Sequence, residues 1–107
     1  MKFLLIYTTC ASVHEAKRIS EILLKHNLIA CSNIYPSMIS LYKWNNKIAQ
    51  DDECTIIMKA IEENFSEIEK QIKKFHSYEI PCIVGLPISQ IDDDYANWLL
   101  QSTTTET

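Results

Sequence analysis

The chain has 107 residues, of which 47% are hydrophobic and 22% are charged, and its formal net charge is −4. This composition is typical of one soluble globular domain and argues against a disordered or membrane-embedded chain. Nucleic-acid binding is disfavoured, because Lys and Arg form no cluster longer than an adjacent pair, and contact with phosphates needs a basic face. We predict a single domain over residues 1–101 and a polar tail over residues 102–107.

Two features of the sequence bear on its cellular compartment. The apolar run over residues 3–7 is shorter than the core of a secretory leader, so we interpret it as a strand. No run approaches the roughly 20 apolar residues of a membrane span. The cysteines form no Cys-x-x-Cys pair, which argues against a zinc knuckle or a thioredoxin-like site. They are Cys10, Cys31, Cys54 and Cys82. We therefore expect reduced, mostly buried thiols in a cytoplasmic protein.

The chain begins with the pattern of a strand followed by a helix. Residues 2–8, which contain the apolar run, have the length and composition of a strand. Ser12 and Glu15 are spaced as a capping box, in which both side chains satisfy backbone donors at a helix start. Apolar residues at helical spacing continue to about Asn27. We therefore predict a helix that packs on a sheet.

Residues 28–59 predict a long β-hairpin. Its limbs, residues 34–44 and 48–57, are rich in β-branched and aromatic side chains. Asn45 and Asn46 can close the turn between them, since asparagine tolerates the left-handed conformation that two-residue turns require. Each limb can reach roughly 35 Å at about 3.3 Å per residue. A domain of this size cannot cover that length with its own helices, so we expect part of the hairpin to contact a partner chain.

Pro36 lies within the first limb. Proline has no amide donor, so it suits an edge, a bulge or a bend in a strand.

The second half of the chain predicts a helix, a strand and a short helix. Asn64 would open the first of these helices, with Glu67 in the box position. The apolar stripe of that helix consists of Phe65, Ile68, Ile72 and Phe75. Residues 82–88 are predicted to form a strand, and residues 95–100 a helix whose acidic start over residues 92–94 suits the helix dipole.

This order of elements predicts an α+β fold of the ferredoxin-like, split βαβ type. It has a four-stranded antiparallel sheet with a long central hairpin, two helices on one face and a short C-terminal helix. The other face of the sheet is then bare, and we expect Tyr35, Ile39 and Leu41 to line it. Contiguous exposed apolar surface is unusual on soluble monomers, so this face favours oligomerisation.

Five short motifs follow one another along the chain. They are residues 30–36 (A-C-S-N-I-Y-P), 40–44 (S-L-Y-K-W), 76–81 (H-S-Y-E-I-P), 86–88 (L-P-I) and 95–99 (Y-A-N-W-L). With Glu53 and Lys59 between them, these motifs make the chain resemble the CutA-type divalent-cation tolerance proteins, the CutA1 family, from Phe3 to Leu100.

The resemblance implies a ferredoxin-like subunit in a tight homotrimer, whose long hairpins pair edge to edge across subunits. This agrees with the overlong limbs and the uncovered sheet face. It also implies a role in tolerance of divalent metals, chiefly copper, and an architecture similar to the PII signalling proteins. No agreed biochemical activity comes with the resemblance.

The chain departs from the family pattern at several positions. The family has a proline, a glycine and an acidic residue where this chain has, in the same order, Ser77, Asn46 and Cys82. The copper ligands proposed for bacterial relatives are a cysteine at the end of the first strand and two adjacent histidines. Here Tyr7 and Phe75 take two of those places and only His76 remains, so a direct transfer of that copper site is not expected.

His76 is the main candidate metal ligand, together with Glu79. Imidazole suits copper and zinc and titrates near neutral pH. The alternative is a histidine that interacts with the dipole at a helix C-terminus. His14 and His26 lie on the first helix, where we expect them to face solvent.

A cleft between subunits is the predicted ligand site. The residues expected to line it are Tyr42, Trp44, Glu53, Lys59, Tyr78, Tyr95 and Trp98. Each of these tyrosines and tryptophans offers a large apolar ring and one hydrogen-bonding group. Interface packing is the alternative for the aromatic residues. Glu53 and Lys59 are either a buried pair or ordinary strand charges.

Two further groups of ligating residues were weighed. Cys54 and Cys82 could form a soft copper(I) site under some strand registers, whereas buried reduced cysteine is the simpler reading. The acidic residues 92–94 lack the spacing of a calcium loop, so helix capping accounts for them.

Three functions remain open, in order of preference. The first is a cytoplasmic, homotrimeric protein of divalent metal (copper) tolerance or response, which requires no cofactor. The second is a PII-like signalling module whose cleft binds a small effector or a partner protein. The third is a hydrolytic or transfer enzyme that uses His76 with Glu79 or Glu53. It ranks last because the chain has no recognisable nucleophile–base–orienter set and no phosphate-cradling loop, so we expect no enzymatic activity.

Overall fold

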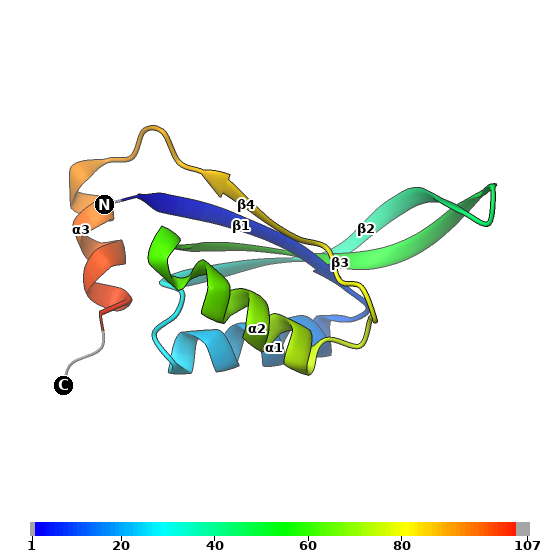
Figure 1. Cartoon of the computed structure of the whole chain (residues 1–107), viewed down its shortest axis with the longest axis horizontal. Helices are drawn as coiled ribbons and strands as arrows, with labels where there is room; N and C mark the ends of the chain where they lie inside the picture. The colour runs from blue at the N-terminus through cyan, green and yellow to red at the C-terminus, as the bar shows by residue number, and fades with distance from the viewer. Residues whose placement is uncertain (1, 105–107) are drawn as a thin grey trace.

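The computed structural model describes residues 2–104. Its antiparallel sheet has the strand order β2-β3-β1-β4, and α1 and α2 cover one face (Figure 1). The strands are β1 (Phe3–Cys10), β2 (Cys31–Trp44), β3 (Lys47–Ile61) and β4 (Ile83–Pro87). The helices are α1 (Val13–Lys25), α2 (Phe65–Phe75) and α3 (Asp93–Ser102), with a 3₁₀ turn, η1 (Glu62–Asn64), before α2. The predicted ferredoxin-like α+β fold is confirmed.

The start of α1 has the predicted capping box. The Ser12 hydroxyl accepts the backbone N–H of Glu15 at 3.2 Å. The Glu15 carboxylate accepts the N–H of Ala11 at 3.1 Å, one residue before the cap itself. The helix ends at Lys25, and Asn27 leaves it with a positive φ of 57°. Asparagine tolerates this left-handed conformation better than most residues.

The predicted hairpin turn is also present. Asn45 and Asn46 have φ values of 51° and 63°, as a two-residue primed turn requires. The strands on either side are longer than the predicted limbs, because β2 begins at Cys31 and β3 continues to Ile61.

A β-bulge interrupts β2 at Pro36. Tyr35 pairs with Thr55, but the next register pair is Met38 with Glu53, so β2 has two residues where β3 has only Cys54. One extra residue exchanges the two faces of a strand, because successive side chains point to opposite sides.

The bulge corrects one prediction. Ile39 and Leu41 lie on the opposite side of the hairpin from Tyr35, so the three residues do not share the bare sheet face. All three are nevertheless strongly exposed.

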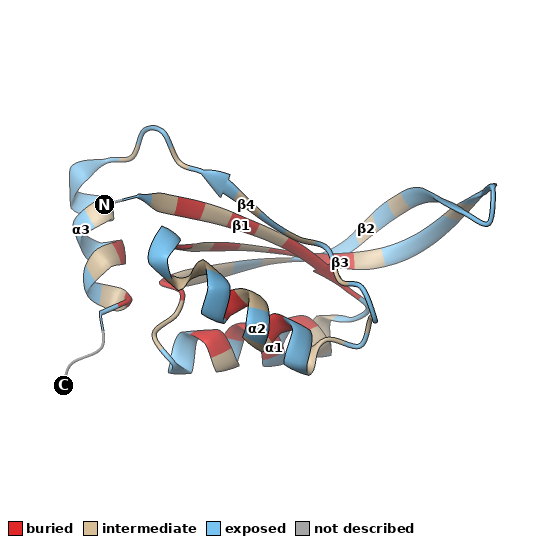
Figure 2. Ribbon diagram, viewed as in Figure 1, coloured by how far each residue is buried: buried red, intermediate tan, exposed pale blue. Residues whose placement is uncertain are grey.

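The main core lies between the sheet and the two helices α1 and α2. Ile6, Ile56 and Met58 on the sheet meet Ile68 and Ile72 on α2, and all five are fully buried. Figure 2 shows that the buried positions stop where the helices stop, and that the far part of the hairpin is mostly exposed.

The single glycine of the chain lies at a close contact between β4 and α2. A Cβ atom at Gly85 would approach the ring of Phe65 to 3.1 Å, so this strand position favours the smallest residue.

A second, smaller core holds α3 at one end of the sheet. Leu99 is fully buried and packs with Ala30 and Ile61. The hydroxyl of Thr103 donates to the Leu99 carbonyl at 3.0 Å, and Thr103 is buried. The predicted polar tail, residues 102–107, therefore begins as ordered structure, and its last residues, 105–107, lie outside the described residues.

Asn64 directly precedes α2, as predicted, but its side chain does not cap the helix. Asn64 is the last residue of the 3₁₀ turn η1 and has αR dihedral angles rather than the extended ones of a usual cap residue. Its side-chain amide instead donates to the Leu28 carbonyl at 3.2 Å, which ties α2 to the segment after α1. Within residues 2–104, no helix is long and apolar enough to span a bilayer.

Candidate functional site

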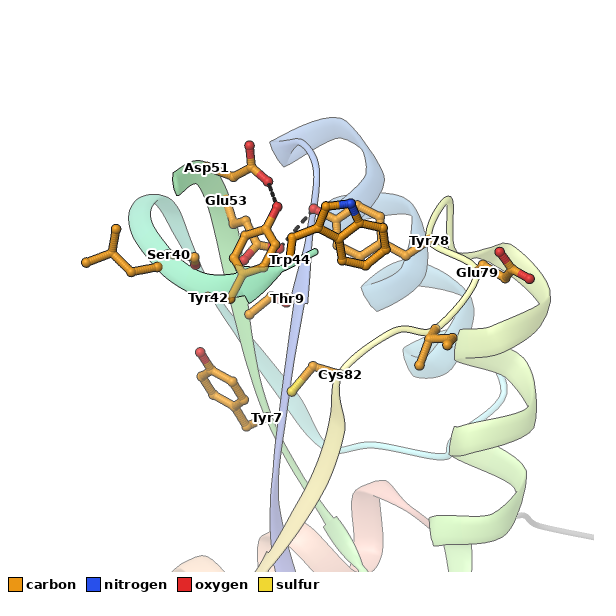
Figure 3. A pocket seen from close by; sticks show the side chains of 12 residues that line it. Tyr7, Thr9, Ser40, Tyr42, Trp44, Asp51, Glu53, Tyr78, Glu79 and Cys82 are labelled. Carbon is orange, nitrogen blue, oxygen red and sulfur yellow. Dashed lines mark hydrogen bonds between the residues drawn. The ribbon is translucent and has the colours of Figure 1, made fainter. Parts of the chain in front are cut away.

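A cavity of about 740 Å³ lies between two segments that are far apart in sequence. One is the arm, defined here as residues 38–53, the part of β2 and β3 beyond the bulge. The other is the connector, defined as residues 76–82, between α2 and β4. Figure 3 shows the side chains that line the cavity. They are Tyr7, Thr9, Ser40, Leu41, Tyr42, Trp44, Asp51, Glu53, Tyr78, Glu79, Ile80 and Cys82.

The alternation of β1 places two of its residues at this cavity. Thr8 and Cys10 point under the helices and are buried, so Tyr7 and Thr9 face the uncovered side of the sheet. The Tyr7 hydroxyl donates to the Met38 sulfur at 3.8 Å, at the base of the arm.

Two tyrosines at the cavity donate to carboxylates. The hydroxyl of Tyr78 donates to Glu53 Oε2 at 2.9 Å, which joins the connector to the arm. Burial and this hydrogen bond raise the pKa of Tyr78 well above its ordinary value. The hydroxyl of Tyr42 donates to Asp51 on the facing strand, and that hydrogen bond, more than burial, raises the pKa of Tyr42. Both phenols are therefore neutral donors near neutral pH.

His76 anchors the connector to the end of β1. Its Nδ1 accepts the backbone N–H of Tyr78 at 3.0 Å, so in the neutral ring the proton is on Nε2. That Nε2 lies 2.7 Å from the Thr9 carbonyl and donates to it. The ring also contacts the ring of Tyr78, with centroids 4.8 Å apart. The one nitrogen lone pair that could bind a metal is thus engaged by the backbone of Tyr78.

Ser77 attaches the same connector to α1. Its backbone N–H donates to Glu15 Oε2 at 2.6 Å, and its hydroxyl donates to Glu15 Oε1 at 3.1 Å. Partial burial alone would raise the pKa of Glu15, but the hydrogen bonds from Ser77 and Ala11 outweigh it and lower that pKa below its ordinary value. A proline at position 77 could not donate the backbone bond.

The predicted cleft residues fall into two groups within one subunit. Tyr42, Trp44, Glu53, Tyr78 and Glu79 all line the cavity. His76 lies immediately next to it in the connector.

Lys59, Tyr95 and Trp98 lie away from the cavity, where α3 meets β3. The Lys59 ammonium donates to Asn33 Oδ1 at 2.9 Å and lies 6.0 Å from the centre of the Tyr95 ring. The rings of Tyr95 and Trp98 are 5.4 Å apart. Glu53 and Lys59 are six residues apart on β3, about 20 Å at 3.3 Å per residue, so they do not form the pair considered from sequence.

Comparison with known proteins agrees with this fold over nearly the whole chain. The profile of the CutA1 divalent ion tolerance protein family matches residues 4–102. The chain belongs to the CutA1 family.

Curated CutA1 relatives support this assignment. The chain is 33% identical to the divalent-cation tolerance protein CutA of Pyrococcus horikoshii over 100 residues, which is 94% of this chain and 97% of that one. It is 38% identical to the Archaeoglobus fulgidus protein of the same description over 94 residues, which is 88% of this chain and 91% of that one.

Solved CutA1 structures have the same fold. CutA1 from Ehrlichia chaffeensis aligns with a TM-score of 0.93 at 34% identity, and the alignment covers 98% of this chain and 99% of the other. CutA1 from Oryza sativa aligns with a TM-score of 0.94 at 29% identity, covering 99% and 97%.

The cysteines of this CutA1 chain have three different environments. Cys54 pairs across the strands with Cys10 on the helix-covered face, and burial raises the pKa of the Cys10 thiol to about 11. Cys82 is exposed at the cavity, just before β4. Because β1 lies between β4 and β3, Cys82 does not neighbour Cys54 on β3. Cys31 is half-buried beside Lys59. The copper(I) site weighed for Cys54 and Cys82 is therefore absent from this subunit.

The other candidate metal ligands are dispersed. His14 and His26 are exposed on or next to α1, as expected. Between Lys2 and Thr104, no three His, Cys, Asp or Glu side chains are grouped so that they could hold a metal ion.

Sequence reasoning missed several lining residues of the CutA1 cavity. They are Tyr7, Thr9, Ser40, Leu41, Asp51, Ile80 and Cys82. For Tyr7 and Thr9, the period-two alternation of the first strand was an available signal. For Ser40 and Asp51, the signal depends on the bulge at Pro36, which decides the side of the arm that faces the cavity.

Proposed function

We propose that this CutA1 protein acts in divalent metal tolerance or response as a homotrimer, with its ligand site in the cavity beside the arm. The observation that carries this proposal is the arm itself. It supplies half of the cavity wall, yet nothing in the described subunit covers it. Trp44 is 67% exposed and Ile48 is 80% exposed.

Assembly is supported by two properties of the arm. Strand β2 is an edge strand, whose free backbone groups can pair with another chain. The register also places Ile39, Leu41 and Ile48 on one side of the arm, opposite the side that carries Asp51 and Glu53. Such an exposed apolar stripe is stabilised when another copy covers it.

The test of assembly is the mass in solution. We expect sedimentation equilibrium to give three times the subunit mass of 12.4 kDa. A folded species with the mass of one subunit at micromolar concentration would contradict the trimer, and a cavity completed by a neighbouring subunit would be lost with it.

Metal binding is proposed at the connector, through His76 and Glu79, with copper as the first metal to test. Glu79 lines the cavity and imidazole is a good copper ligand. A metal at Nδ1 of His76 would have to displace the Tyr78 N–H, so we expect modest affinity and a change in connector structure.

Copper titration followed by calorimetry tests this site. Wild type and His26→Ala should bind alike, because His26 is exposed just after the C-terminal end of α1, whereas Glu15, which bonds the connector, lies at the other end of that helix. His76→Ala should bind more weakly. Equal copper affinity in all three proteins would contradict a metal site at the connector.

A PII-like module that binds a small effector is the second candidate. The size of the cavity favours it, since small-molecule sites span roughly 300–1,000 Å³ and are usually lined by aromatic and apolar groups with a few polar ones. A thermal-shift screen against metabolites tests this function. If no metabolite shifts the transition, the signalling proposal fails.

We also propose a cytoplasmic location and no catalytic role. The free thiols support a reducing compartment, although relatives differ: the Archaeoglobus fulgidus structure is described as periplasmic and the Arabidopsis thaliana relative as chloroplastic. Both ring nitrogens of His76 are hydrogen-bonded to the backbone, so this side chain has no free lone pair with which to act as a base. Cell fractionation, and turnover assays that compare wild type with His76→Ala, test the two statements.

A further inference from the structure

The charge at the cavity has one sign. Asp51, Glu53 and Glu79 are the charged residues among the twelve that line it, and these twelve include no lysine, arginine or histidine. A ligand that enters this site therefore meets carboxylates without a counter-charge from the same lining. This arrangement favours a cation and disfavours phosphates and carboxylic acids.

The hydrogen-bonding groups at the cavity are mostly acceptors. The hydroxyls of Tyr42 and Tyr78 donate to Asp51 and Glu53, and the hydroxyl of Tyr7 donates to Met38. These three phenols therefore have only lone pairs left to offer, as do the remaining carboxylate oxygens. The complementary ligand group is a donor of several hydrogen bonds, which a primary ammonium is.

Aromatic rings form much of the remaining wall. Tyr42 and Trp44 come from the arm and Tyr78 from the connector, and Figure 3 shows the hydroxyl of Tyr42 bonded to Asp51 and that of Tyr78 bonded to Glu53. Aromatic faces attract cations and pack well against alkyl chains, with tryptophan the strongest of them. A hydrated inorganic ion gains little from such rings, whereas an alkylammonium matches both the rings and the carboxylates.

From these three observations we infer that the cavity binds an organic primary ammonium ion. Glu53 and Asp51 accept its N–H groups, and Trp44, Tyr42 and Tyr78 contact its carbon chain. This inference rests on the proposed function only for the location of the site, because every residue that it uses belongs to one subunit.

The test uses the two tryptophans as reporters. In a ¹H–¹⁵N NMR spectrum the indole N–H signals of Trp44 and Trp98 are assigned with the variant Trp44→Phe. Trp44 lines the cavity and Trp98 lies on α3 against Tyr95, so Trp98 is an internal control. The probe is n-pentylammonium chloride at constant ionic strength, compared with 1-pentanol and sodium pentanoate, which have the same chain length and a different charge.

The expected result is a saturable shift of the Trp44 signal with pentylammonium and a stationary Trp98 signal. The alcohol and the carboxylate should bind about tenfold more weakly or worse, because they lack the charge and its cation–π contact. Binding of all three probes with equal affinity, or equal movement of both indole signals, would overturn the inference.

A matched pair of variants tests the carboxylate. Glu53→Gln removes the charge but keeps an oxygen that can accept the Tyr78 hydroxyl, so the fold should persist and the dissociation constant for pentylammonium should rise about tenfold. Asp52→Asn makes the same charge change one residue away. Asp52 pairs with Ile39 on the side of the arm opposite Glu53 and does not line the cavity, so this variant should bind like wild type. Equal affinity of both variants would contradict the assigned role.

The same samples separate this inference from the proposed assembly and from metal binding. A single-subunit mass with intact pentylammonium binding would refute the trimer alone. A trimer without pentylammonium binding would refute the ammonium site alone. A Trp44 shift that appears with copper or magnesium and depends on Glu53, but not with pentylammonium, would assign the cavity to a metal and overturn the inference.

Discussion

Two isoleucines on one strand show how unevenly this sheet is covered. Ile48 and Ile56 both belong to β3 and, being eight residues apart, point to the same side of it. Ile56 is fully buried and Ile48 is 80% exposed. The difference between them is what lies opposite, because α1 and α2 cover Ile56 and no part of the described chain covers Ile48.

The lengths of the elements explain this contrast. The 15 residues of β3 extend about 50 Å at 3.3 Å each, whereas the 13 residues of α1 extend about 20 Å at 1.5 Å each. A sheet this long cannot be covered by helices this short. The body of the protein is therefore stabilised by its own core, and the arm depends on its turn, its ladder and any partner.

The largest expected effect is in the body. Ile56→Ala removes a fully buried side chain and should lower the free energy of unfolding by about 2–5 kcal/mol. Urea denaturation followed by circular dichroism measures this. A loss under about 1 kcal/mol would mean that the core relaxes around the missing atoms and that the body is less rigid than described.

The next effect concerns the attachment of the connector to the body. Glu15→Gln removes the charge that accepts both Ser77 bonds and should cost about 1–2 kcal/mol at pH 7. Glu21→Gln, at an exposed position of the same helix, is the matched control and should be near neutral.

The pH dependence of this contribution has a definite sign. The native pKa of Glu15 lies below its ordinary value of 4.5, so its stabilisation is complete above that value and is lost as the pH falls through the lowered native pKa. The difference in unfolding free energy between wild type and Glu15→Gln should therefore shrink on acidification below about pH 4.5. A difference that stayed constant down to strongly acid pH would show that the carboxylate charge is not what holds Ser77.

A smaller effect is expected at the tip of the arm. Asn46 has a φ of 63°, where an alanine side chain is strained by roughly 1 kcal/mol, while glycine is not. Asn46→Ala should speed hydrogen exchange of the arm amides about fivefold and leave those of β1 unchanged, and Asn46→Gly should not speed it. Equal acceleration in β1 would show that the arm and the body open together.

The smallest effect on the subunit itself is expected at Ile48. Ile48→Ala, the same truncation as at Ile56, should change subunit stability by less than about 0.5 kcal/mol under conditions where copies do not associate. Where they do associate, it should weaken assembly, seen as a lower mean mass in sedimentation. An unchanged mass would place the interface elsewhere on the arm or on the bare sheet face.

Local sequence was sufficient for the features that depend on neighbouring residues. The strands, the capping box at Ser12 and the turn at Asn45 and Asn46 each follow from propensities within a few residues. Their order along the chain was enough to predict the ferredoxin-like fold, and the motifs were enough to indicate the CutA1 family.

Tertiary structure alone decided the features that depend on distant partners. Ser77 donates to a carboxylate 62 residues away. The side chain of Asn64 donates to a carbonyl 36 residues away instead of capping α2. The extra residue at the Pro36 bulge turned Ile39 and Leu41 away from Tyr35 and turned Ser40 and Tyr42 toward the cavity. The alternation of a strand divides its side chains into two faces. Beyond a bulge, the hydrogen-bond register with the next strand decides which of these faces points to which side of the sheet. The cavity is formed by residues of β1, the arm and the connector together, so no single stretch of sequence contains it.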